Sequence, residues 1–516
     1  MKRFFLPLIL LTITALASCT SKTNQIVDVV PSTEKMQRPF GRHDYKAFAQ
    51  PDKVHAPQTW FHYIGGNVSH EGITADLEAI AGAGISGVQL FHGQFGGQWP
   101  ATTDNIECLS KNWDEAVKHT AEECRRLGLR FTMQNCPGWA MSGGPWIKPE
   151  NAMRTIVHSR TDVDGKDINV TLPKPQPSQE EWRDYRDIAV LAFPTAEGDT
   201  GKPLELKSVK GDGKFEWSDL MTGKKDRINF PPAKDGPHWV EMRFTTPAVV
   251  RAVEIPSVQT LNHNMSFEPN VHITAYALLP NGKMAKIVDA DLPQSSWQDN
   301  KPITFACPEV GEAIGCRVEF QNKYSMNLAA VNIWSAARKN SWESEAGWTL
   351  RSFERTADDV THNPQAYVKG EEVIDITEHM TAEGELKWSA PKSGKWTILR
   401  IGNVNAGEEN GPAPKEGTGW ECDKLSTEGP EVHYAGYIGR LTGGVLQGGK
   451  LNSLLLDSWE CRTQMWTMKM EQEFKEYNGY DLRRWMPALL GYTIDSPETT
   501  TRFLWSSTQG GYGLGV

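Results

Sequence analysis

An acidic side chain that follows an apolar run is the residue of this sequence best suited to chemistry. The run 454–456 consists of three leucines and leads into Asp457, Ser458, Trp459 and Glu460. We predict that the run is a buried strand that delivers Glu460 beside the Trp459 indole. An indole lowers the solvation of a neighbouring carboxyl group and so raises its pKa. Such a group can donate a proton to a leaving oxygen, so Glu460 is the candidate general acid. The alternative is a surface glutamate that caps the next helix.

Three further acids accompany Glu460. Asp457 is either a supporting hydrogen-bond partner or a structural acid. Glu421 and Asp423 occur in the stretch "GTGWECDKLS", and alternate residues of a strand point to the same side. Two acids on one side suit a metal ion or sugar hydroxyls, although a polar loop explains them equally well.

A set of neutral polar and aromatic residues ends the first three predicted strands. Donors and acceptors beside aromatic rings suit the hydroxyl groups of sugars, although each residue taken singly is more often structural. The set consists of His62, Asn67, Gln89, His92, Gln134, Asn135 and Trp139.

The elements that position these residues alternate between strand and helix. We expect strands at 59–66, 85–93 and 129–139, with helices at 72–84 and 113–128 between them. This βαβ rhythm predicts a parallel sheet. In a (β/α)₈ barrel the carboxyl ends of such strands form the active-site face, but a doubly wound sheet loads the same ends. We therefore expect α/β architecture over residues 51–153.

The rhythm changes over residues 154–390, where short alternating strands and turns predict an inserted β-sandwich-like domain. The Asn281-Gly282 pair between strand-like arms predicts a hairpin. The inserted domain either contacts carbohydrate or serves as a scaffold. Barrel-like alternation returns over residues 391–505, with strands at 394–404 and 451–460 and helices at 430–441 and 463–479.

Composition excludes one class of partner and leaves the cysteines open. The 516 residues carry a net charge of -10 and no basic block, which argues against a nucleic-acid binder. Apart from Cys19, seven cysteines form no CxxC pair and no zinc pattern. Cys307 and Cys316 are either a disulfide within one sheet or two members of a set of buried thiols.

The N-terminus has the form of an export signal. A basic start, a short apolar core and "LASC" resemble a bacterial lipoprotein signal peptide over residues 1–19. This form predicts lipid attachment at Cys19, a polar tether over residues 20–50, and a periplasmic or outer-membrane location. The alternative is plain secretion with a chance cysteine.

Several stretches together carry a family resemblance. "NCPGWAMSGGPWI", "GTGWECDKLS" and "LLLDSWE" resemble glycoside hydrolase family 106, the α-L-rhamnosidases. The resemblance implies a (β/α)₈ TIM barrel with β-domain insertions, and inverting release of terminal α-L-rhamnose from plant or bacterial polysaccharides. It also implies calcium at the sugar site, with ligands that the sequence does not assign, and the general-acid role for Glu460. From their residue types we predict substrate-binding roles for His62, Asn67, Gln89, Asn135, Trp139, Glu421, Asp423, Asp457 and Trp459.

An inverting mechanism also needs a base carboxylate, which the family keeps well downstream of the DSWE motif. Residues 506–516 depart from the family pattern and are poor in structure-forming residues. We interpret the end as a truncated or frameshifted reading frame, and expect this chain to lack the base and to be largely inactive. The alternative functions are a non-catalytic carbohydrate-binding surface lipoprotein and a related glycosidase that acts on another sugar.

Overall fold

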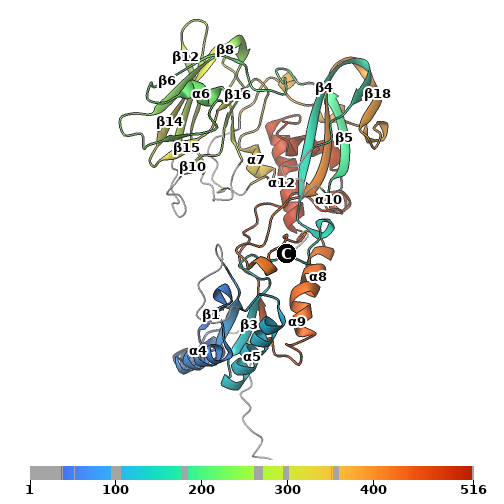
Figure 1. Cartoon of the computed structure of the whole chain (residues 1–516). Coiled ribbons are helices and arrows are strands. Elements are labelled where there is room, and N and C mark those ends of the chain that lie inside the picture. Colours follow the sequence, from blue (N-terminus) through green and yellow to red (C-terminus); the bar gives the residue numbers. More distant parts are fainter. Residues whose placement is uncertain are drawn as a thin grey trace, which may run out of the picture. The chain divides into compact units, whose positions relative to one another are not determined.

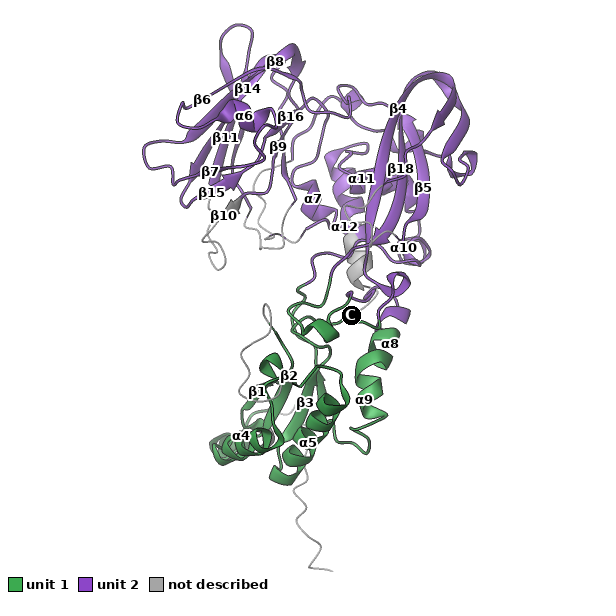
Figure 2. Ribbon diagram, viewed as in Figure 1, with its two compact units in different colours: residues 1–146, 409–419, 432–460 green, residues 147–408, 420–431, 461–516 purple. Residues whose placement is uncertain are grey.

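The computed structural model describes residues 37, 39–51, 53–94, 106–175, 184–260, 271–293, 301–349, 351 and 359–513 (Figure 1). The predicted signal peptide, Cys19 and the first part of the tether lie outside the described residues. The chain forms two compact units, each assembled from separate stretches (Figure 2). Unit 1 contains Met1–Trp146, Glu409–Gly419 and Val432–Glu460, and unit 2 contains Ile147–Glu408, Trp420–Glu431 and Cys461–Val516.

Unit 1 is built on a parallel sheet with the strand order β1-β2-β3-β19. The strands are β1 (Gln58–His62), β2 (Gly87–Phe91), β3 (Arg130–Gln134) and β19 (Ser453–Leu455). The predicted βαβ rhythm and parallel pairing are confirmed. Over the described residues these four strands form an open sheet, and no closed barrel is seen there.

Two helices cover one face of this sheet. α4 begins after Ser69, whose Oγ accepts a hydrogen bond from the Gly72 amide at 3.0 Å. α5 begins after Ser110, which caps it in the same way, and ends at Gly128. Both helices bury an apolar stripe against the sheet, in one core cluster that includes Phe131. The helical segments of this unit are α3 (Arg42–Ala49), η1 (Lys53–His55), η2 (Ile64–Gly66), α4 (His70–Gly82), α5 (Lys111–Leu127), η8 (Lys415–Gly417), η9 (Ala435–Gly439) and α9 (Arg440–Thr442). α8 (Glu428–Tyr434) belongs partly to each unit.

Residues 206–334 of unit 2 form antiparallel sheets. A five-stranded sheet, β12-β11-β14-β8-β6, and two three-stranded sheets, β13-β9-β16 and β10-β15-β7, bury their inner residues in one common core. The predicted hairpin is confirmed: β11 pairs with β12 through a turn at Gly282, whose φ is 80°. The elements are β6 (Leu206–Gly211), α6 (Trp217–Met221), β7 (Ile228–Phe230), β8 (His238–Val249), β9 (Ala252–Ile255), β10 (Gln259–Thr260), β11 (Val271–Leu278), β12 (Met284–Asp291), β13 (Ile303–Ala306), β14 (Glu312–Asn322), β15 (Met326–Leu328), β16 (Asn332–Trp334) and α7 (Trp342–Glu345).

The stretches of unit 2 before and after residues 206–334 together form another antiparallel sheet, in the order β17-β5-β18-β4. Helices pack on one of its faces, where Leu399 of β18 joins Phe474 of α10 and Phe503 of α12 in one core. A second core that includes Ile398 lies on the opposite face. The elements are η3 (Pro149–Asn151), β4 (Arg154–Thr171), β5 (Arg186–Pro194), η5 (Pro364–Ala366), η6 (Gly370–Glu372), β17 (Ile374–Asp375), η7 (Thr377–His379), β18 (Glu385–Asn405), α10 (Met470–Asn478), η10 (Arg483–Trp485), α11 (Met486–Leu489) and α12 (Pro497–Gly513).

The prediction that residues 394–404 form a barrel strand is wrong. They belong to β18, which pairs antiparallel with both β4 and β5. A long apolar run is typical of a parallel strand buried on both faces. β18 has the same composition because it is a central strand with a core on each side.

Two further expectations need correction. The leucine run 454–456 is not a buried strand, since β19 is a short edge strand and Leu454 and Leu456 are 37% and 56% exposed. Residues 506–513 are not poor in structure, because the backbone of α12 stays helical to Gly513.

The seven cysteines of the described chain are all free and buried, so Cys307 and Cys316 belong to a set of buried thiols. In the part of the chain that the structure describes, no helix combines the length and the apolar character needed to cross a bilayer.

Candidate active site

Glu460 lies beyond the end of β19, in an irregular segment that follows Leu455. Its side chain is half-buried, and burial raises the pKa of its carboxyl group. The nearby Asp457 carboxylate is the second cause of that shift, because a negative charge disfavours ionisation of its neighbour. The group is therefore more readily protonated than an ordinary glutamate, as proton donation requires.

Asp457 and Trp459 share this segment with Glu460. Both are half-buried, and an Asp457 oxygen accepts a hydrogen bond from the Ser458 hydroxyl at 3.2 Å. The physical link to Glu460 that the structure identifies is the charge of Asp457. Asp457 thus acts on the candidate acid electrostatically, in line with the predicted supporting role.

The carboxyl ends of the other strands lie along the same edge of the sheet. His62 pairs in register with Phe91, and Leu455 pairs with Gln134. The Asn135 amide donates to the Leu455 carbonyl at 2.9 Å, which fixes the end of β3 beside the end of β19. Parallel pairing thus gathers the predicted strand-end residues on one edge of unit 1.

An aromatic group stands at this edge. The His62 ring stacks on Phe91 with centroids 5.2 Å apart, and meets Trp139 edge-on at 6.2 Å. Trp60, which is 59% exposed, lies 5.6 Å from His62. Gln89 is the register partner of Trp60 and so projects from the same face. Burial lowers the pKa of His62, which favours a neutral imidazole. An exposed ring beside neutral polar groups is a surface on which a sugar can stack.

Other members of the predicted set are engaged within the protein. Gln134 is buried and donates to the Ala140 carbonyl at 2.7 Å. Asn135 donates to the Met141 carbonyl at 3.1 Å. His92 is buried, accepts a hydrogen bond from the Trp113 indole at 2.9 Å, and has a pKa lowered to about 4 by burial. The bonds of Gln134 and Asn135 shape the loop that follows β3, and the bond of His92 joins the end of β2 to α5.

Asn67 is half-buried and lies just after the short helix η2, where its backbone N–H donates to the Ile64 carbonyl at 3.1 Å. It belongs to unit 1 together with the other strand-end residues and Glu460.

Glu421 and Asp423 belong to unit 2 and are buried. Glu421 forms an ion pair with Lys424 at 2.7 Å. Burial opposes the charge of Lys424, but the Glu421 carboxylate outweighs it, so the pKa of Lys424 is raised. Asp423 accepts hydrogen bonds from the Leu425 amide at 3.0 Å and the Thr467 hydroxyl at 2.8 Å. Both oxygens of Asp423 and the Oε2 oxygen of Glu421 thus accept hydrogen bonds from donors of the protein itself.

Sequence reasoning missed Lys424, Gln464 and Thr467. Gln464 also donates to Asp423, and Lys424 donates to the Cys461 thiol at 3.4 Å. Gln464 and Thr467 lie 40 or more positions after Lys424 and Asp423, so no local sequence pattern links the two groups. The structure also corrects the helix predicted from residue 463, since α10 begins only at Met470 and leaves Gln464 and Thr467 in an irregular segment.

The described residues offer no obvious metal cage. Among them, no group of three or more His, Cys, Asp or Glu side chains is arranged to hold an ion. Calcium therefore stays a prediction without assigned ligands, and no chemical step below depends on a metal.

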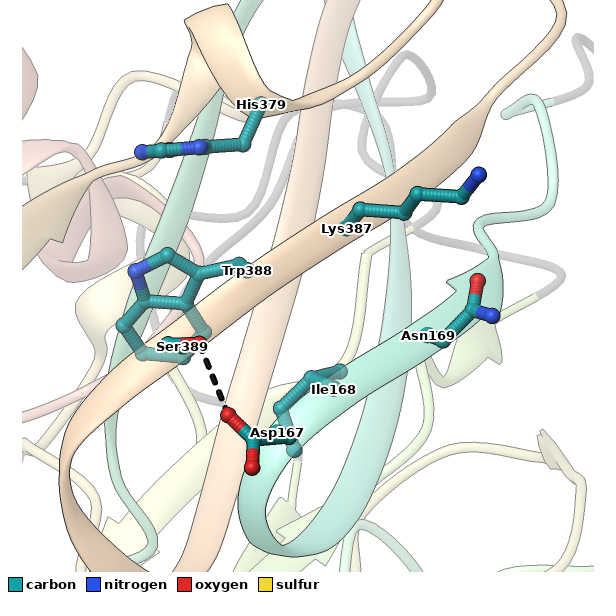
Figure 3. A pocket seen from close by; sticks show the side chains of 7 residues that line it. All are labelled: Asp167, Ile168, Asn169, His379, Lys387, Trp388 and Ser389. Atoms are coloured by element: carbon teal, nitrogen blue, oxygen red, sulfur yellow. Dashed lines mark hydrogen bonds between the residues drawn. The ribbon is translucent and has the colours of Figure 1, made fainter.

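A separate cleft of about 570 Å³ lies on unit 2, between β4, β18 and η7 (Figure 3). Its lining consists of Asp167, Ile168, Asn169, His379, Lys387, Trp388 and Ser389. Asp167 accepts a hydrogen bond from Ser389 at 2.7 Å. Trp388 is only 8% exposed, because it packs edge-on against Trp396. It therefore offers no open ring face to a sugar, and the cleft contains none of the predicted site residues.

A carboxyl group of raised pKa at the carboxyl edge of a parallel α/β sheet is an arrangement that suits a glycoside hydrolase. The chain belongs to the Glyco_hydro_106 family, described as alpha-L-rhamnosidase, whose model matches residues 49–509.

Two proteins are similar to this chain over about nine-tenths of its length. A protein of Formosa agariphila named "Putative beta-glucuronidase" is 30% identical over 461 residues, which is 89% of this chain. A solved rhamnosidase from Novosphingobium sp. PP1Y is 26% identical, with a TM-score of 0.74 over 91% of this chain. The chain spans 27% of the length of the first protein and 44% of the second.

Proposed function

We propose that this protein is a glycosidase that releases terminal α-L-rhamnose from plant or bacterial polysaccharides, with Glu460 as general acid. The observation that carries the proposal is a half-buried carboxyl group of raised pKa at the strand-end edge of the sheet, in a chain of the rhamnosidase family. We also propose that the parallel sheet of unit 1 belongs to a (β/α)₈ barrel, which the described strands represent only in part.

The proposed reaction inverts the anomeric centre. Glu460 donates its proton to the glycosidic oxygen as the bond from that oxygen to the anomeric carbon breaks. Water attacks the same carbon from the opposite face, and a second carboxylate takes its proton. We assign no described residue to that base, and we therefore expect turnover by this chain to be slow. Asp457 keeps Glu460 protonated until the leaving oxygen arrives, because its charge opposes ionisation.

Substrate binding belongs to the same edge of unit 1 in this proposal. His62, Gln89, Trp139 and Trp459 supply rings and neutral polar groups for sugar hydroxyls, together with Asn67 and Asn135. Glu421 and Asp423 remain predicted ligands of the sugar, although their present partners favour a structural role. Calcium also stays a prediction, with ligands unassigned.

The test is a comparison of Glu460→Gln with the wild type on two substrates. A natural rhamnoside needs protonation of its leaving oxygen, whereas an aryl rhamnoside with a strongly acidic phenol does not. We expect Glu460→Gln to lower kcat on the natural substrate by roughly 10²- to 10⁴-fold, and to affect the activated aryl substrate far less.

Glu473→Gln is the matched control, because Glu473 is also a glutamate whose pKa is raised by burial, in α10. It should leave both rates unchanged. Equal losses of Glu460→Gln on the two substrates, or none on either, would contradict the acid role. Sugar binding without any turnover by the wild type would favour a non-catalytic carbohydrate-binding protein.

A further inference from the structure

The cleft between β4, β18 and η7 is lined by residues of unit 2 alone (Figure 3). Its volume of about 570 Å³ falls in the range of small-molecule sites, about 300–1,000 Å³. Five of its lining residues are polar and exposed, namely Asp167, Asn169, His379, Lys387 and Ser389. The cleft is therefore large enough for a small ligand and offers it mainly hydrogen-bonding groups.

Strand pairing gathers four of these side chains on one face of the sheet. Lys387 of β18 is the register partner of Asn169 of β4, and Ser389 is the partner of Asp167. Residues two apart in a strand point to the same side, and directly opposite residues have Cβ atoms about 4.5–5.5 Å apart. The four side chains are therefore close enough to contact one ligand. In Figure 3 the polar ends of Lys387 and Asn169 point in the same direction.

The short helix η7 supplies a further wall. Leu386 of β18 pairs with Val170 of β4 on one edge and with Met380 on the other. The end of η7 therefore lies along the edge of β18 that faces away from β4. His379 is the last residue of η7, and its exposed side chain lines the cleft. Polar groups from three segments thus surround the same space.

Much of the hydrogen-bonding capacity of the cleft is not used by the protein. Among the residues that the structure describes, no hydrogen bond or ion pair engages the side chains of Asn169, His379 or Lys387. Asp167 accepts the Ser389 hydroxyl through Oδ1 at 2.7 Å, and no described donor bonds to its Oδ2. An ammonium group, an amide, an imidazole and one carboxylate oxygen are thus available to a ligand.

These groups match a neutral sugar better than an ion. An ammonium group donates, a carboxylate oxygen accepts, and an amide does both. Neighbouring sugar hydroxyls can satisfy all three, because each hydroxyl donates and accepts. The charges of Lys387 and Asp167 balance each other, so the cleft lacks the excess of one sign that would favour a charged ligand.

We propose that this cleft is a non-catalytic binding site for a neutral saccharide. It holds a sugar unit by hydrogen bonds to Lys387, Asn169 and Asp167, without a stacking ring, since Trp388 is buried against Trp396. Each such contact is weak in an open cleft, so the natural ligand is a polysaccharide that presents many copies of the unit. The proposal concerns binding without hydrolysis and does not depend on Glu460.

The test is amide hydrogen exchange of the full chain, with and without sugar. The probes are the methyl glycosides of L-rhamnose, D-galactose and D-glucose, with D-galacturonate as a charged comparison. We expect at least one neutral glycoside to slow exchange over residues 379–389. In Lys387→Gln the sugar concentration that gives half of this effect should rise roughly tenfold or more, because a hydrogen bond from a charged donor is lost.

Lys395→Gln is the matched control, because Lys395 is also an exposed lysine of β18 but does not line the cleft. It should bind the sugar as tightly as the wild type does. Neither variant should change the turnover of an aryl rhamnoside.

Three results would overturn the proposal. No neutral glycoside slows exchange over 379–389 in the wild type, only D-galacturonate does so, or Lys387→Gln binds as tightly as Lys395→Gln. The proposed hydrolysis fails independently, since unchanged turnover of Glu460→Gln would remove the acid role and leave the exchange result in the cleft as it stands.

Discussion

At the scale of single residues, two glutamates with raised pKa values differ in what they can do. Glu460 is half-buried at a strand-end edge, so a ligand can reach it. Glu343 is almost fully buried, and its pKa is raised to about 7 mainly by burial. It accepts the Thr304 hydroxyl at 2.5 Å and lies 3.7 Å from Arg351. A shifted pKa marks a functional residue only where solvent or substrate has access.

Glu343 should make stability depend on pH. Its folded pKa of about 7 exceeds the ordinary value of 4.5, so the folded carboxyl group stays protonated while the unfolded one ionises. The free energy of unfolding should therefore fall by about 3 kcal/mol as pH rises through this window. Glu343→Gln should flatten that fall in denaturant titrations at several pH values.

Glu345→Gln is the control for this measurement, because Glu345 lies in the same helix and pairs with Lys339 at 2.7 Å. It should keep the wild-type dependence on pH. Parallel pH profiles of Glu343→Gln and the wild type would show that Glu343 ionises normally in the folded protein.

At the scale of elements, helix ends place the strands that bear the site. α5 ends at Gly128, whose φ of 67° lets the Leu129 amide bond to the Cys124 carbonyl at 2.8 Å. The chain then enters β3 two residues later. Because β3 pairs with β19, this turn determines where the segment that carries Glu460 begins.

Gly128→Ala should therefore lower the free energy of unfolding by about 1 kcal/mol, because alanine is strained at a left-handed position. Gly82→Ala is the control: Gly82 is a helical residue of α4 with open space around its Cα. It should be neutral or stabilise by up to about 1 kcal/mol. Thermal or chemical unfolding of both variants measures the difference, and equal effects would refute the role of the turn.

At the scale of the whole molecule, a site-bearing α/β unit is interrupted by a long antiparallel part. The chain leaves unit 1 after Trp146 and returns at Glu409. It leaves unit 1 again for residues 420–431 and once more after Glu460, so the candidate acid is the last residue of its unit. Cellular location is also a property of the whole molecule. We propose that the protein is exported and held at a membrane by a lipid anchor.

The proposed anchor is Cys19. The wild type should incorporate labelled fatty acid and sediment with membranes, because acylation supplies the apolar surface that holds a soluble domain at a bilayer. Cys19→Ala should lose the label, whereas Ser21→Ala, two residues on, should keep it. Labelling of Cys19→Ala at the wild-type level would place the lipid elsewhere or remove the lipoprotein proposal.

The sequence by itself determined the local elements of unit 1 and the candidate acid. Helix caps at Ser69, Ser110 and Gly128, with apolar periodicity between them, are encoded within a few residues. The Asn-Gly hairpin is local in the same way. A carboxyl group beside an indole after an apolar run was likewise visible in one short stretch.

Tertiary structure alone decided which strands pair and which acids meet which donors. The composition of residues 394–404 predicts a parallel strand, because a strand buried on both faces is apolar in either kind of sheet. In the structure this run pairs antiparallel with β4 and β5. Asp423 stays a predicted sugar ligand, but only the folded chain shows its hydrogen bond with Thr467, 44 positions away. Pairing and hydrogen bonding between distant residues depend on the folded path of the chain, which local composition does not contain.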